Sequence, residues 1–129
     1  MRVLLDSCTF VWYDTDPSQL SPLAYNRVTD PGVTLFLSVG TIWELVVKQK
    51  AGRSDAPKGD IPATARYHVG RGNLRLLPLE LDHVGRLPTL PDHHRDPWDR
   101  MLICQSLAER LTILTPDKLI HQYPVAWEW

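Results

Sequence analysis

The chain of 129 residues has few cysteines, no excess of charge of either sign and no long apolar run. Its two cysteines, Cys8 and Cys104, are too few for a disulfide framework or a cysteine-rich zinc site, and they suit a reducing, cytoplasmic setting. A formal net charge of -1 excludes a strongly basic protein that coats nucleic acid. The longest uncharged stretch, residues 31–43, is shorter than the ~20 residues of a membrane-spanning helix, so no membrane partner is expected.

What is present is the composition of an ordinary globular domain, with 43% apolar and 22% charged residues. The length fits one domain over residues 1–129. Eleven prolines exceed the average usage of about 5%, and they separate many short elements.

Short apolar runs alternate with helical patterns along the chain. Strands are expected at residues 2–5, 34–37, 74–79 and 112–114, with an edge strand at 125–127. Helices are expected after an N-cap at Ser7, after an N-cap at Ser21, and at residues 38–51, 61–70, 81–87, 97–110 and 116–121. The helix at 38–51 carries one apolar stripe of Val39, Ile42, Trp43, Val46 and Val47. This alternation predicts an α/β layer fold with a mostly parallel sheet.

Acidic side chains follow the expected strands. Asp6 comes directly after the first strand, Asp117 follows the fourth, and Glu44 lies one to two turns into the helix after the second. Asp96 and Asp99 open the long helix that leads into the fourth strand. Because sites in parallel sheets lie at the carboxyl ends of the strands, most of these acids should meet at one edge. Oxygen-only ligands favour a hard ion such as Mg²⁺ or Mn²⁺.

Each acid also has a purely structural interpretation. Glu44 lies four residues before Lys48, the spacing of a helix surface pair. Asp96 and Asp99 fit an N-cap and a first-turn acid, with a proline between them at the first helical position. Taken together, the acids favour a metal site, since carboxylates crowded at one sheet edge repel each other unless a cation neutralises them.

Four short strings resemble a known family: VLLDS at residues 3–7, IWEL at 42–45, HRDPWDRML at 94–102 and LTPD at 114–117. They look like a PIN domain, and the nearest branch is the VapC-like toxin ribonucleases of type II toxin–antitoxin systems. The resemblance covers essentially the whole chain, and residues 94–100 are its most specific part. It implies a PIN-like three-layer α/β fold with a mostly parallel four- to five-stranded sheet flanked by helices.

The resemblance also implies roles for the acids. Asp6, Glu44, Asp99 and Asp117 would be metal ligands, with Asp117 the least uniformly direct, and Asp96 would be an added acid of this subgroup in the catalytic set. Asp96 and Asp117 would hold a second ion or orient water molecules. The implied ion is Mg²⁺, with Mn²⁺ as a substitute. Such an ion lowers the pKa of a bound water and neutralises charge on the scissile phosphate.

The implied function is that of a Mg²⁺-dependent endoribonuclease, the toxin component of a type II toxin–antitoxin system. It would hydrolyse phosphodiester bonds in RNA, leaving a 5′-phosphate and a 3′-hydroxyl. A cognate antitoxin and a homodimer are the implied protein partners. A non-toxin PIN nuclease in RNA processing, and a catalytically inactive PIN module that binds RNA or protein, remain open.

Substrate binding requires positive charge, and residues 46–79 carry a net charge of +5. Basic side chains there could follow an RNA backbone or form a solvated surface. Without the five candidate acids the rest of the chain carries +4, so near-neutrality excludes only non-specific coating of nucleic acid. Arg95 and Arg100 flank the acids and would contact phosphate or pair with neighbouring carboxylates. The candidate substrate-binding residues are Ser7, Thr115, Lys48, Arg53, Arg95 and Arg100.

Other interpretations fit less well. A phosphatase with an aspartyl nucleophile needs a second aspartate two residues after the first, where Cys8 stands. A phospho-acceptor receiver domain needs a lysine after a late strand, and Lys118 is poorly placed for it. The adjacent His93 and His94 would point in different directions, so we expect loop or cap roles for them rather than a zinc site or a general base.

Overall fold

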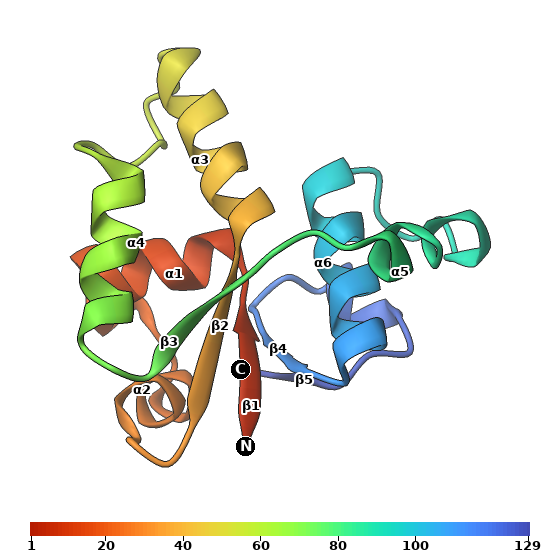
Figure 1. The fold of residues 1–129 in the computed structure, drawn as a ribbon, viewed down its shortest axis with the longest axis horizontal. Helices are drawn as coiled ribbons and strands as arrows, with labels where there is room; N and C mark the ends of the chain where they lie inside the picture. The colour runs from red at the N-terminus through yellow and green to blue at the C-terminus, as the bar shows by residue number, and fades with distance from the viewer.

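The computed structural model describes residues 1–129 and contains one five-stranded sheet in which every neighbouring pair of strands is parallel. The strand order is β3-β2-β1-β4-β5 (Figure 1). The α/β class is therefore confirmed, with a sheet that is parallel throughout. The strands are β1 (Arg2–Leu5), β2 (Thr34–Ser38), β3 (Leu74–Leu77), β4 (Thr112–Leu114) and β5 (Trp127–Glu128).

Helices cover both faces of the sheet, which makes three layers (Figure 1). Along β1, Val3 and Leu5 belong to a core shared with α1, α2 and α4, whereas Leu4 belongs to a second core shared with α6. This alternation is what a central parallel strand buried on both faces requires. None of the helices combines the length and hydropathy needed to cross a bilayer. The α-helices are α1 (Ser7–Thr15), α2 (Pro22–Thr29), α3 (Val39–Lys50), α4 (Ile61–Gly70), α5 (Leu81–Val84) and α6 (Pro97–Glu109), with 3₁₀ turns at Pro17–Gln19, Leu87–Thr89 and Ile120–Gln122.

Several local expectations require correction. The third strand ends at Leu77 and not at residue 79, α5 ends at Val84 and not at residue 87, and the edge strand lies at Trp127–Glu128 and not at residues 125–127. The N-cap of α1 is Asp6 and not Ser7, because β1 passes into α1 with no loop and the Asp6 carboxylate accepts a hydrogen bond from the Thr9 backbone at 2.8 Å. The expected helix at residues 116–121 is replaced by the 3₁₀ turn at Ile120–Gln122. There the Asp117 carboxylate accepts from the Leu119 backbone N–H at 2.8 Å, a local turn that competes with an α-helix.

The apolar stripe of α3 does not form a buried face. Val39, Trp43 and Val47 are 45%, 65% and 44% exposed, and only Ile42 and Val46 pack partly against the core. The fully buried side of the helix carries Thr41, Glu44 and Leu45 instead. A carboxylate thus faces inward while a tryptophan faces solvent, and α3 extends from the end of β2 beyond the sheet (Figure 1). This inversion points to a site on the inner side of α3.

Candidate metal centre

Asp6 lies at the end of the central strand and is 4% exposed. Its carboxylate accepts hydrogen bonds from the Thr9 backbone at 2.8 Å and from the hydroxyl of Thr115, which follows β4. The Cys8 thiol is 3.4 Å from the nearer carboxylate oxygen. Burial raises the pKa of Asp6, and the bonds from Thr115 and Thr9 oppose that rise. The Asp6 carboxylate is therefore held in one orientation at the edge of the sheet.

Glu44 is 2% exposed, on the second turn of α3. Its Oε2 pairs with Lys48 Nζ at 2.6 Å, but its Oε1 is buried without a hydrogen-bond partner. Burial raises the pKa of Glu44, Lys48 opposes the rise, and Asp96 and Asp6 add to it. The pair expected on the helix surface does form, yet its carboxylate is in the interior. An unpartnered buried carboxylate oxygen is costly, and a bound cation would satisfy it.

Asp96 and Asp99 stand at the start of α6. The Asp96 carboxylate caps the helix by accepting from the Trp98 backbone at 2.8 Å and from the Asp99 backbone at 3.4 Å. Burial and, after it, the negative charges of Asp96, Glu44 and Asp6 raise the pKa of Asp99 to about 7, with His94 opposing the rise. Four acids from three elements therefore act on one another at this edge of the sheet.

Asp117 joins this group through His94, which the sequence did not identify as a site residue. His94 Nε2 is 2.9 Å from Asp117 Oδ2 and 3.1 Å from Asp99 Oδ2. The expected loop and cap role also holds, since His94 Nδ1 accepts from the Asp96 backbone at 3.1 Å. The signal for the missed contact was the position of His94 two residues before the helix cap. Ligand atoms of His94, Asp99 and Asp117 all lie within 4.8 Å of one another, so this group could hold a metal ion.

The chemistry of these residues fits a hard divalent cation. The acids offer oxygen donors, and one of these, Glu44 Oε1, lacks any partner in the protein. Burial raises the pKa values of Asp6, Glu44 and Asp99, and repulsion by neighbouring carboxylates adds to the rise at Glu44 and Asp99, as expected where a positive charge is missing from an acidic cluster. Oxygen donors of this kind suit Mg²⁺ or Mn²⁺.

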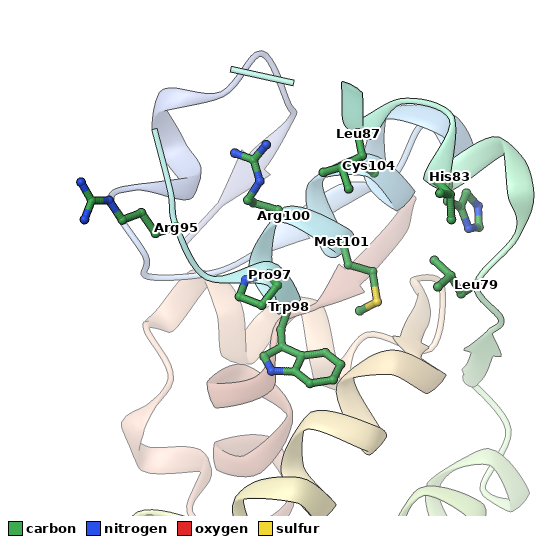
Figure 2. A pocket seen from close by; sticks show the side chains of 10 residues that line it. Leu79, His83, Leu87, Arg95, Pro97, Trp98, Arg100, Met101 and Cys104 are labelled. Carbon is green, nitrogen blue, oxygen red and sulfur yellow. The ribbon is translucent and has the colours of Figure 1, made fainter. Parts of the chain in front are cut away.

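A basic groove adjoins the acids between α3 and the start of α6. It has a volume of about 530 Å³, and its lining includes Lys48, Arg53 and Arg95 beside Asp96 and Trp98. Lys48 pairs with Glu44, and Arg53 pairs with Asp55 at 3.0 Å on the surface. Arg95 is exposed and projects away from the neighbouring side chains (Figure 2). Three of the six residues expected to bind substrate therefore line one groove next to the candidate metal centre.

The other three differ in their surroundings. Thr115 is fully buried and its hydroxyl is bonded to Asp6, so it orients an acid. Arg100 donates to the Pro91 carbonyl at 3.1 Å and to the His94 carbonyl at 3.3 Å, and pairs with Asp92 at 3.1 Å. This arrangement favours the carboxylate-pairing alternative for Arg100. Ser7 is partly exposed in the first turn of α1, next to Asp6.

An apolar pocket of about 450 Å³ lies on the other side of Trp98. Figure 2 shows the side chains of Trp98 and Met101 from α6 on one wall, with Leu79 and His83 opposite. The pocket and the exposed stripe of α3 leave apolar surface uncovered near the acids. Contiguous uncovered apolar surface is typical of a protein-binding face. The residues that line the apolar pocket are Leu79, His83, Val84, Leu87, Arg95, Pro97, Trp98, Arg100, Met101 and Cys104.

Comparison with known proteins gives structural matches only. The chain matches no protein-family model and no curated protein. It is similar to a chain of VapBC2 from Rickettsia felis bound to a DNA fragment from its promoter, with a TM-score of 0.70, 15% identity, and coverage of 100% of this chain and 99% of that one. It is also similar to a chain of DNA-bound VapBC from Salmonella typhimurium, with a TM-score of 0.65, 15% identity, and coverage of 99% and 97%.

A third similar structure is VapBC-1 from nontypeable Haemophilus influenzae, with a TM-score of 0.60, 16% identity, and coverage of 99% of this chain and 97% of that one. At such low identity the likeness concerns the fold. The matches extend over nearly the whole of both chains, and they confirm the expected PIN-like fold.

Proposed function

We propose that this chain, which has a PIN-like fold, is a metal-dependent endoribonuclease and the toxin component of a type II toxin–antitoxin system. One observation carries the proposal: Glu44 is buried with an unpartnered Oε1, and its charge and that of Asp6 both raise the pKa of Asp99. A buried carboxylate oxygen without a partner is costly, and groups of this kind concentrate at functional sites.

Asp6, Glu44, Asp99 and Asp117 would hold Mg²⁺, or Mn²⁺ in its place. The bound ion would act as a Lewis acid, neutralising charge on a phosphodiester and acidifying water. The protein prepares these donors in advance. Thr115 and the Thr9 backbone fix the Asp6 carboxylate, and Lys48 engages Glu44 Oε2 so that Oε1 is left for a ligand.

RNA is the substrate that the surroundings support. Lys48, Arg53 and Arg95 line the groove beside the acids, where they would attract successive backbone phosphates. Trp98 lines the same groove and offers an aromatic surface on which an unpaired base could stack. A groove that is basic along its walls and acidic at one end is suited to binding a phosphodiester strand next to a cation.

The toxin assignment adds a protein partner, the cognate antitoxin. Its support is the whole-chain likeness to chains of VapBC complexes together with the exposed Val39, Trp43 and Val47 on α3. The apolar pocket beside Trp98 adds to the uncovered surface (Figure 2). We also propose that the chain forms a homodimer, which light scattering during gel filtration would test directly.

The nuclease activity is tested with the purified full-length chain and end-labelled RNA. Wild type should cleave RNA with Mg²⁺ and not with EDTA, and the products should carry 5′-phosphates. Asp6→Asn should abolish cleavage, whereas Asp82→Asn, an exposed acid on α5 outside the site, should cleave like wild type. Cleavage that survives EDTA, or that Asp6→Asn leaves intact, would refute the proposal. A folded wild type that binds RNA but cleaves none would instead indicate a catalytically inactive module.

The toxin role needs a separate test. Expression of wild type should arrest growth, and Asp6→Asn should not. Cleavage in vitro without any growth defect would favour a nuclease of RNA processing over a toxin.

A further inference from the structure

His94 connects three parts of the site through one imidazole ring. Its side chain is 11% exposed. Nδ1 accepts a hydrogen bond from the Asp96 backbone N–H at 3.1 Å. Nε2 lies 3.1 Å from Asp99 Oδ2 and 2.9 Å from Asp117 Oδ2. The ring therefore lies between the start of α6 and the turn that follows β4.

The backbone contact determines which ring nitrogen carries the proton. A backbone N–H can only donate, so Nδ1 must present its lone pair to Asp96. The hydrogen of the imidazole is then on Nε2. Nε2 therefore donates to Asp117 Oδ2, with Asp99 Oδ2 close by, and it has no lone pair to offer to a cation. This geometry argues against His94 itself as a metal ligand.

We infer that His94 is a positioning residue that sets the relative placement of the Asp99 and Asp117 carboxylates. This inference rests on the proposed metal-dependent function of the site. Asp99 lies on α6 and Asp117 in the turn after β4, and their like charges would separate them without a donor between them. The Nε2–H donates to Asp117 Oδ2, and Asp99 Oδ2 lies 3.1 Å from the same nitrogen, so the ring holds both carboxylates close together and leaves Asp99 Oδ1 for a cation. Outer hydrogen bonds of this kind orient metal ligands.

The loop that carries His94 is itself anchored. The His94 backbone N–H donates to the Tyr123 hydroxyl at 2.8 Å, and the His94 carbonyl accepts from Arg100 at 3.3 Å. These contacts give a structural reason for the HRDPWDR string: His94 donates, Asp96 caps the helix, Asp99 offers oxygen and Arg100 secures the loop.

Two substitutions separate the positioning role from a loop role. His94→Asn places a carbonyl oxygen near the position of Nδ1, which keeps the acceptor for Asp96 and removes the donor. His94→Gln places an amide nitrogen near the position of Nε2, which keeps the donor and removes the acceptor. The readout is Mn²⁺ binding to the full-length protein, followed by electron paramagnetic resonance of the free ion. Circular dichroism at 25 °C verifies folding.

We expect His94→Asn to lower Mn²⁺ affinity at least about tenfold, in the range found for ligand-orienting residues, and His94→Gln to stay within about threefold of wild type. The inference would be overturned if His94→Asn bound Mn²⁺ with wild-type affinity, or if both variants lost affinity equally. It would also be overturned if wild type bound no Mn²⁺, or if His94→Asn were unfolded. RNA cleavage is measured separately. If the two variants differ in Mn²⁺ affinity as expected while wild type cleaves no RNA, the nuclease proposal fails and the positioning role stands.

Discussion

We expect Asp99 to make the metal-free protein less stable as pH rises. Its pKa in the folded protein is about 7, against an ordinary value of 3.8, because the side chain is buried among other acids. Between about pH 4 and 7 the folded state therefore holds a proton that the unfolded state releases. The contribution of Asp99 to the free energy of unfolding is fully present below this window. It is lost as pH rises through the window, by ~1.4 kcal/mol per pH unit and about 4 kcal/mol in all.

Asp99→Asn removes this ionisation and should reduce the fall, while Asp6 and Glu44, whose pKa values burial also raises, keep part of it. The assay is urea unfolding, followed by tryptophan fluorescence with EDTA present, at pH 4.5 and pH 8. At pH 8 the variant should be more stable than wild type by up to about 4 kcal/mol, and at pH 4.5 the two should be similar. Asp82→Asn, which alters an exposed acid, should retain the wild-type pH dependence. Equal stability of wild type at both pH values, or an unchanged fall in Asp99→Asn, would refute the proposed crowding of acids.

Three further predictions test other contacts. Thr115→Val should lower the free energy of unfolding by about 1–3 kcal/mol, because the buried Asp6 carboxylate loses a donor, and Thr115→Ser should recover most of this in urea unfolding. Leu45→Ala should lower the free energy of unfolding by about 2–5 kcal/mol, whereas Trp43→Ala, at a 65% exposed position, should lower it by less than about 0.5 kcal/mol. Equal losses in the two variants would contradict the orientation of α3. Arg95→Ala should weaken RNA binding and reduce its logarithmic salt slope by about 1 in filter-binding titrations, and an unchanged slope would place RNA elsewhere.

Much of the fold was predictable from local patterns. The run Val3-Leu4-Leu5 is uniformly apolar because a central parallel strand is buried on both faces, so it was identifiable as a strand. Asp6 follows it directly, and the carboxyl ends of parallel strands share one edge. That topological rule brings Asp6 near Asp117, more than a hundred residues later, before any coordinates are known.

The orientation of α3 was not predictable in the same way. Val39, Trp43 and Val47 have the spacing of a core-facing stripe, and periodicity alone does not say whether such a stripe meets the protein's own core or solvent. The burial of Glu44 follows from how α3 leaves the sheet, which is a tertiary property. His94 is similar, because its ring reaches Asp117 only through a loop path that Arg100 and Tyr123 anchor.

The most direct test of the central claim is a map of RNA ends in cells. Total RNA is taken after brief expression of wild type or of Asp6→Asn, and new 5′-phosphate ends are sequenced. If the acids form a metal-dependent ribonuclease site, wild type should generate discrete new 5′-phosphate ends and Asp6→Asn should generate none. Identical end maps from the two proteins at equal expression would contradict the account.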